Sequence, residues 1–301
     1  LRMIKNNING IFLFDKHSNI TSNSALQKVK HIFGANKAGH SGTLDPLATG
    51  LLPICFGEAT KVSSYLLHSS KTYVVTAKLG ETTETGDAEG RTIDTKTISI
   101  VNHSDFKKHL GLFLGESFQK PPMFSAVKIN GKRLYKYAQK GEIIDRESRK
   151  INVYKITLIN LTEKDFEIEV KCSKGTYIRV LIEDIAKKMG NYAHVTQLRR
   201  TNIELLDNYQ MHNLIQISNM SKNELHNCIH PMDIVFKNKL KIKVNTEQST
   251  QFNHGQNIKI ENEELIIDEA IIIYNESNQL QGIGMVLGGN IIKPNKVFNL
   301  N

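Results

Sequence analysis

Short apolar runs between polar turns are the main pattern along this chain, and some of them have helical spacing. The run GIFLFD at residues 10–15 is almost entirely apolar, which predicts a short buried strand. The next segment, SNITSNSALQKVKHIFG, has apolar residues at helical spacing and predicts a helix that ends at Gly34. Ser24 and Gln27 are placed to form a capping box at the start of this helix.

The middle of the chain alternates between strand-like and helix-like runs without a regular βαβ order. The polar stretch ETTETGDAEGRT predicts a loop or a connection between strands. Such an irregular order is typical of the α+β class. Strands are expected at residues 71–79, 151–160 and 166–172, and helices at residues 104–115, 134–140 and 180–190.

The last quarter of the chain has a different pattern. Residues 208–230 are polar and predict short helices with loops. From Lys239 onward, short Ile-rich runs are separated by Asn, Glu and Gly, which predicts a small all-β module of about 60 residues, near the lower limit for independent folding. The expected domains are therefore residues 1–237 and 238–301. The sequence Gly-Ile-Gly at 282–284 lies too late to open a βαβ unit and is interpreted as a β-turn.

Composition narrows the function classes. Lys and Arg number 39 against 30 Asp and Glu, and the formal charge of +9 favours a polyanionic partner, nucleic acid first, over a basic surface without a partner. No run of about 18 apolar residues is present, so no membrane span is expected. No signal peptide is expected either. Three distant cysteines without a C-x-x-C pair argue against a disulfide framework or a zinc ribbon and fit a reducing cytosol.

The loop GHSGTLDPLATG, residues 39–50, carries one carboxylate among three glycines. Pro46 biases Asp45 away from helix, and the glycines permit close approach of a ligand to the backbone. The alternative is a turn in which Asp45 caps a helix that begins at Leu47. An aspartate phosphatase needs a second carboxylate where Leu47 stands, and a glycosidase needs a second acid that the loop lacks. Walker A and Rossmann motifs are also absent.

Two other stretches are candidates for chemistry. CSKGTYIR, residues 172–179, runs from a strand end into a helix start, which suits anion contact but also fits a plain surface turn. Arg179 fits the plain turn least, because apolar residues follow it. Tyr73 is either a half-buried strand tyrosine or a flat surface on which a base stacks. The spacing HNCIH at residues 226–230 is typical of an accidental match, so no metal site is predicted.

Taken together, these stretches resemble the TruB family of tRNA pseudouridine synthases. The resemblance covers roughly residues 8–201, and its one departure is Ser41, where the family usually has Thr. Residues 239–301 resemble the family's C-terminal PUA-like domain more weakly. The matching motifs are, in family order, GHSGTLDPLATG with LLPICFGEATK, KTYVVTAKLG, PPMFSAVKINGKRLYKYAQKGE, CSKGTYIRVLIEDIA and AHVTQLRRT.

The resemblance implies a role for each candidate. Asp45 would be the nucleophile that attacks the target uridine, with the ribose C1′ favoured over the base. Arg179 would pair with Asp45 and lower its pKa by about 1–3 units. Tyr73 would stack on the flipped base and could assist proton removal. The remaining expectations place Tyr177 and Leu198 in the pocket wall, His40 against the RNA near the vacated base position, and Lys61, Lys128, Lys132, Arg199 and Arg200 on the RNA.

The resemblance also implies a fold, a substrate and a setting. The fold would be a pseudouridine synthase core with a large mixed sheet and flanking helices, followed by the PUA-like domain. The substrate would be uridine 55 in the T-arm of tRNA, without cofactor or metal, and the protein would be a cytoplasmic monomer with no obligate protein partner and no membrane contact. The alternatives are a guide-RNA-dependent relative that modifies ribosomal RNA, an RNA-folding protein with secondary catalysis, and an unrelated basic enzyme.

Overall fold

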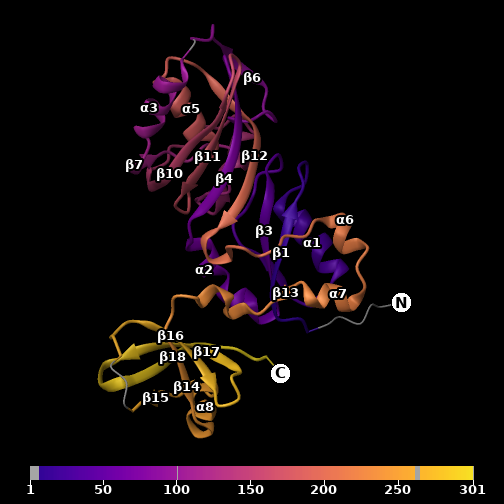
Figure 1. Cartoon of the computed structure of the whole chain (residues 1–301), viewed down its shortest axis with the longest axis vertical. Coiled ribbons are helices and arrows are strands. Elements are labelled where there is room, and N and C mark those ends of the chain that lie inside the picture. Colours follow the sequence, from indigo (N-terminus) through magenta and orange to yellow (C-terminus); the bar gives the residue numbers. More distant parts are fainter. Residues whose placement is uncertain (1–6, 100, 262–264, 301) are drawn as a thin grey trace.

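A long, twisted sheet runs through the larger part of the molecule, and a smaller sheet lies at the end that holds the C-terminus (Figure 1). The computed structural model describes residues 7–99, 101–261 and 265–300. Within these residues the larger sheet has nine strands, and two of them, next to the candidate loop, pair in parallel. Its order is β13 (Ile229–His230), β1 (Gly10–Lys16), β3 (Thr49–Phe56), β12 (Ala193–Ile203), β4 (Lys71–Leu79), β11 (Asp165–Cys172), β10 (Arg149–Leu161) and β7 (Gly115–Gln119), with β2 (Ala38–His40) added to β3.

Helices cover the sheet, and two small ribbons extend from it. The α+β class with a large mixed sheet is therefore confirmed. No helix in the described part of the chain is long and apolar enough to cross a membrane. The helices that precede the C-terminal module are α1 (Ser22–Ile32), η1 (Gly57–Val62), α2 (Ser63–His68), α3 (His103–Gly111), α4 (Leu134–Ala138), α5 (Ile178–Lys188), η2 (Glu204–Leu206), α6 (Leu214–Ser218), α7 (Lys222–Asn227) and η3 (Met232–Phe236), and the ribbons are β5 (Glu81–Thr83) with β6 (Thr92–Thr95) and β8 (Lys128–Ile129) with β9 (Lys132–Arg133).

Strand β1 is buried on both faces, which explains its uninterrupted apolar run. Phe12 and Phe14 point into a core that also contains residues of α1 and α5. Ile11 and Leu13 point the other way, into a second core. All four side chains are at most 1% exposed. The strand that leads to the candidate site is thus fixed by packing from two sides.

The second core joins the large sheet to the C-terminal module. Leu13 and Leu51 of the large sheet share this core with Ile283 and Phe298 of the module. The module curls a five-stranded sheet around helix α8 (Thr246–Asn253), which the sequence pattern did not predict. Its strands are, in sheet order, β14 (Lys241–Val244), β16 (Ala270–Asn275), β17 (Leu280–Leu287), β18 (Ile291–Val297) and β15 (Ile258–Lys259), with η4 (Gly288–Asn290) before β18.

Three local predictions are wrong. The first helix is capped by the Thr21 side chain, which accepts from the Ser24 N–H, so Ser24 is not the cap. Helix α3 ends at Gly111 instead of continuing to residue 115, because the chain turns there into β7. The glycines at 282 and 284 lie inside strand β17; a Cβ at Gly282 would stand 2.1 Å from a carbonyl oxygen of β18. Close backbone approach explains them, and no turn is formed.

Candidate active site

The candidate loop connects β2 to β3 and contains no helix. The N–H of Ala48 donates to the carbonyl oxygen of Asp45 at 3.1 Å, which makes a turn, and β3 begins directly afterwards. Asp45 therefore does not cap a helix at Leu47. Gly42 and Gly50 have φ values of +75° and +95°, in the region that favours glycine. The conformation of the loop depends on both glycines.

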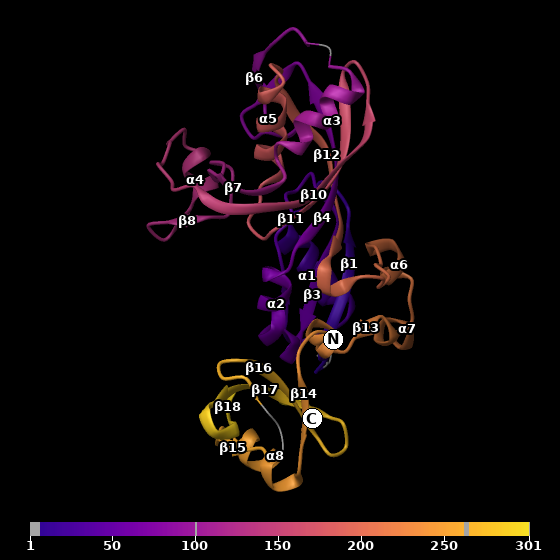
Figure 2. The same ribbon diagram turned by 60° about the vertical axis from the view of Figure 1, so that its left-hand side comes forward.

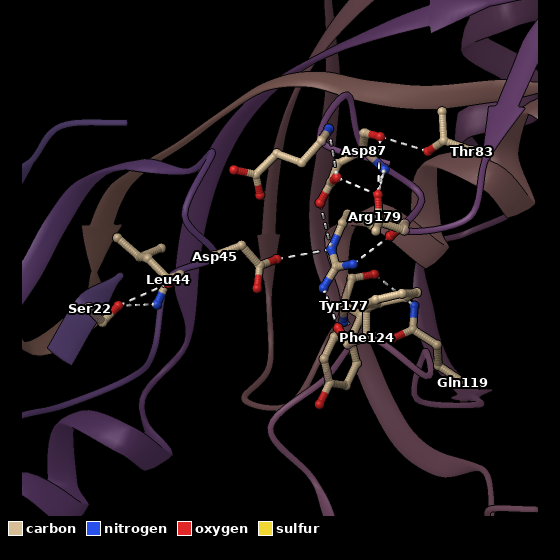
Figure 3. A network of polar contacts seen from close by, with 11 residues as sticks. Ser22, Leu44, Asp45, Thr83, Asp87, Gln119, Phe124, Tyr177 and Arg179 are labelled. Atoms are coloured by element: carbon tan, nitrogen blue, oxygen red, sulfur yellow. Dashed lines mark hydrogen bonds and ion pairs between the residues drawn. The ribbon is translucent and has the colours of Figure 1, made fainter. Parts of the chain in front are cut away.

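Buried side chains hold the peptide groups on either side of Asp45. The Ser22 hydroxyl donates to the carbonyl oxygen of Leu44 at 2.9 Å and accepts from the Leu44 N–H at 2.8 Å. The Lys16 ammonium group donates to the carbonyl oxygen of Pro46 at 3.1 Å. Figure 3 shows the Ser22–Leu44 pair beside the outstretched Asp45 side chain. Sequence reasoning missed Ser22 and Lys16, whose positions in a helix start and at a strand end carried no special signal.

Arg179, in the first turn of α5, reaches the Asp45 carboxylate. Its Nε lies 2.9 Å from Oδ2 of Asp45 and 3.5 Å from Oδ2 of Asp87. Its Nη1 donates to the carbonyl oxygen of Thr85, and its Nη2 donates to that of Phe124 at 2.9 Å. One guanidinium group thus joins three loops at one point (Figure 3). The predicted Asp45–Arg179 pairing is present in the geometry.

Asp87 is a member of the site that the sequence analysis did not single out. It is 3% exposed, and its Oδ1 accepts from the Thr85 hydroxyl at 2.6 Å and from the Glu89 N–H at 3.1 Å. The signal was available, since GDAEG is a second short glycine-flanked loop with a carboxylate. Its pairing with Arg179 makes a two-carboxylate site around one cation.

Asp45 and Arg179 differ in how far their side chains are exposed to solvent. The Arg179 side chain is 5% exposed, whereas the Asp45 side chain is 38% exposed. Burial raises the pKa of the Asp45 carboxyl group above its ordinary value; the Arg179 cation opposes this rise and the Asp87 carboxylate adds to it. Arg179 thus acts on the Asp45 pKa in the expected direction, but burial has the larger effect and the net shift is upward.

Tyr73, on β4, faces the same loop from the sheet. It lies directly opposite Arg200 of β12 in the antiparallel register. Burial raises the pKa of the Tyr73 phenol, and the nearby Arg200 cation counteracts part of the rise. The ring is therefore a neutral, apolar surface at neutral pH, which suits stacking on a base.

The proposed pocket residues come from three further elements. The Tyr177 backbone is held by Gln119 of β7, whose amide donates to the Tyr177 carbonyl oxygen at 3.1 Å and accepts from its N–H at 2.7 Å. Leu198 is 8% exposed and packs in the first core. Nδ1 of His40 is buried without a hydrogen-bond partner among the described residues, and burial lowers the pKa of this imidazole, so it is neutral at pH 7.

Two predicted RNA contacts are already engaged within the protein. Arg200 is 1% exposed and cannot reach a phosphate in this conformation. Lys61 contacts Glu58 at 2.6 Å and donates to the carbonyl oxygen of Val297 at 2.8 Å, so it holds the C-terminal module. In this structure both side chains serve the fold, and their contact with RNA stays an untested prediction.

The other three basic candidates remain at the surface. Arg199 is 41% exposed and forms a two-bond pair with Asp15, at 2.9 and 2.8 Å. Lys128 is exposed on the β8–β9 ribbon, and the Lys132 ammonium group lies 3.9 Å from the centre of the Tyr137 ring. This ribbon and α4 stand away from the large sheet (Figure 2).

Family models and relatives cover most of the chain. The N-terminal domain model of the TruB family pseudouridylate synthases matches residues 30–178. The C-terminal domain model of tRNA pseudouridylate synthase B matches residues 179–237. A tRNA pseudouridine synthase B of Actinobacillus pleuropneumoniae is 41% identical over 97% of both chains. One of Neisseria meningitidis is 43% identical over 93% of this chain and 90% of its own.

Solved structures agree in fold. The crystal structure of a Cbf5-Nop10-Gar1 complex contains a chain that matches with a TM-score of 0.72 at 24% identity, over 96% of this chain and 85% of that one. An archaeal box H/ACA sRNP Nop10-Cbf5 complex matches equally well at 22% identity. The sequence relatives carry the assignment, and this chain belongs to the TruB family of pseudouridine synthases.

Proposed function

We propose that this enzyme converts uridine 55 in the T-arm of tRNA to pseudouridine, with Asp45 as the nucleophile. The observation that carries the proposal is the difference in exposure between Asp45 and its partner Arg179. Asp45 is partly open, whereas Arg179, Asp87 and the residues that hold the loop are buried. A carboxylate that the fold fixes in place and leaves accessible is suited to attack. Pseudouridine formation on an unmodified tRNA transcript tests this directly.

The reaction is an isomerisation, so the residues present are sufficient in principle. The C1′–N1 bond of the uridine breaks and a C1′–C5 bond forms. The C5 proton leaves and N1 gains a proton, so no atom or electron is added. Asp45 would attack the ribose C1′, and the Arg179 cation would keep its carboxylate ionised against the effect of burial.

The target base must leave its stack, at a cost of a few kcal/mol. Tyr73 would stack on the extruded base and could assist removal of the C5 proton. Tyr177 and Leu198 would line the pocket. The neutral His40 would contact the RNA near the vacated base position.

Affinity would come mainly from phosphate contacts outside this pocket. Lys128 and Lys132 on the β8–β9 ribbon and Arg199 beside the loop are the accessible basic residues among the original candidates. We further propose a division into a catalytic domain, residues 1–237, and a PUA-like RNA-binding domain, residues 238–301. Lys241 and Lys243 are exposed on strand β14 of the latter and would contact tRNA.

The protein would act in the cytoplasm as a monomer without an obligate protein partner. The guide-dependent alternative requires other chains, so activity on a bare transcript would exclude it. An RNA-folding role beside catalysis is compatible with the same site. It would show as tRNA refolding by a variant that binds but does not turn over.

A further inference from the structure

Arg200 is one of the largest fully buried side chains in the described part of the chain, with 1% of its surface exposed. A buried guanidinium group is unfavourable unless hydrogen bonds replace the water that it loses. No carboxylate forms an ion pair with Arg200 among the described residues. Its guanidinium group instead donates hydrogen bonds to backbone oxygens, which suggests a specific structural role for this arginine.

These oxygens belong to the two ends of the Asp45 loop. Nε of Arg200 donates to the carbonyl oxygen of Leu51 at 2.7 Å, and Nη2 donates to that of Gly42 at 2.8 Å. One side chain therefore binds the chain on both sides of Asp45, at Gly42 before it and at Leu51 in strand β3 after it.

The backbone of Arg200 supports the same loop. Arg200 pairs with Gly50 where β12 and β3 run in parallel, and a Cβ at Gly50 would stand 2.2 Å from the Arg200 carbonyl oxygen. A Cβ at Gly42 would stand 3.1 Å from Nη1 of Arg200. The Arg200 backbone therefore excludes a side chain at Gly50, whereas a side chain at Gly42 would require a small shift of the Arg200 guanidinium group.

The same residue faces the second proposed catalytic side chain. Arg200 lies opposite Tyr73 in the β12–β4 register, and its cation lowers the pKa of the Tyr73 phenol against the larger effect of burial. Arg200 is therefore in contact with both the backbone that carries Asp45 and the strand position that carries Tyr73.

We propose that Arg200 is a positioning residue that fixes the Asp45 loop relative to Tyr73, and that it does not bind phosphate. The inference deepens the proposed function and rests on Asp45 and Tyr73 acting on one nucleotide. A lysine cannot replace it, because an ammonium group on a flexible stem does not reproduce two directed bonds of a planar group. Displacement of reacting groups by about 1 Å typically costs about 100-fold in rate.

The test compares Arg200→Lys with a matched control, Arg146→Lys. Arg146 is half-buried and also donates to two backbone oxygens, of Pro121 and Ile144, but it lies outside the Asp45 loop. Single-turnover pseudouridine formation is measured at saturating enzyme, and tRNA affinity is measured against salt concentration. We expect Arg200→Lys to slow turnover about 100-fold while affinity and salt slope stay within twofold of the wild type. The control should keep both rate and affinity.

Two outcomes would overturn the inference. One is a turnover rate of folded Arg200→Lys within threefold of the wild type. The other is a loss of affinity with an unchanged saturating rate, which would make Arg200 a phosphate ligand. If wild-type enzyme formed no pseudouridine on the transcript, the proposed function would fail instead.

Thermal unfolding establishes that Arg200→Lys is folded. If it is not, phenylglyoxal labelling of the wild-type protein, read by mass spectrometry, replaces it, with the more exposed Arg199 as internal reference. We expect Arg200 to stay unlabelled with or without tRNA. Labelling of Arg200 in the free protein that tRNA blocks would refute the inference.

Discussion

The Nε atom of Arg179 lies 2.9 Å from Oδ2 of Asp45, and the two side chains differ sharply in exposure. The same Nε lies 3.5 Å from Oδ2 of Asp87, and Nη1 and Nη2 of Arg179 donate to backbone oxygens. The fixed partner of this pair is therefore the cation, and the carboxylate is the group left free to approach a substrate.

Replacing Asp45 by Asn should abolish pseudouridine formation while tRNA binding persists, because an amide keeps the shape and loses the nucleophile. Turnover should fall by at least about 1000-fold, a loss typical for a residue that forms the covalent bond. Activity is measured on a tRNA transcript and binding by filter retention. Turnover above the level that deamidation supplies would contradict the assignment.

The same variant should be more stable at neutral pH. Burial raises the pKa of Asp45 in the folded protein, so ionised Asp45 destabilises the fold at pH values above that pKa. The difference should disappear as the pH falls below the pKa of the unfolded carboxyl group, about 3.9. Melting temperatures of Asp45→Asn and wild type between pH 4 and 8 check this. A variant that melts lower at pH 7 would show that the ion pair outweighs burial.

The pH profile of the wild-type enzyme should also reflect the raised pKa of Asp45. If ionised Asp45 attacks, the acid limb of the saturating single-turnover rate should have its midpoint above about 3.9, the value of a free aspartate. The midpoint should rise further when Arg179 is replaced by Gln, since the cation lowers the pKa of Asp45. An acid limb that moved to lower pH in Arg179→Gln would refute this coupling.

Arg179→Lys should reduce turnover by about 100-fold and leave tRNA affinity nearly unchanged. The guanidinium group serves four acceptors in different directions, and an ammonium group can serve only part of them. Saturating rates and dissociation constants are measured side by side. A larger loss in affinity than in rate would assign Arg179 to RNA binding instead.

The salt dependence of tRNA affinity should distinguish residues that bind phosphate from residues that contact the extruded base. Lys128→Gln should lower the slope of log affinity against log salt by about one, because its exposed cation releases a counterion on binding. Tyr73→Leu should keep the wild-type slope and reduce turnover, since a neutral ring releases no ions. Equal slopes for Lys128→Gln and the wild type would remove the ribbon from the phosphate contacts.

The C-terminal module should matter for stability as well as for RNA. Phe298 is 5% exposed in the core that it shares with Leu13 and Leu51. Phe298→Ala should lower the free energy of unfolding by about 3 kcal/mol. Denaturant titration gives this value, and Phe118→Ala, at a side chain 76% exposed, is the control. A truncation at residue 237 would expose the same core, so we expect it to unfold more easily than the whole chain.

The sequence predicted elements whose pattern is local. Strand β4 matches the expected residues, and Asp45 and Arg179 were recognised as partners from family motifs. Prediction failed where a tertiary neighbour decides: Arg200 belongs to a basic motif and becomes buried because β12 lies between β3 and β4. Asp87 lies in the short glycine-flanked loop GDAEG, a signal that was overlooked, and the fold shows that this loop lies beside α5. The sign of the Asp45 pKa shift also required burial, which spacing alone does not reveal.

The core shared by the two sheets sets the distance between the large sheet and the C-terminal module. Leu13 and Leu51 of the large sheet share one buried core with Ile283 and Phe298, so the C-terminal module is packed onto that sheet. If tRNA contacts both parts, as proposed, the distance between its two contact sites must match the distance between the two parts of the protein. An RNA of the right local sequence but the wrong span gains nothing from the second contact, since rigid linkage raises the effective concentration only for matching geometry. On this proposal, we expect the enzyme to discriminate among RNAs by their length as well as by their bases.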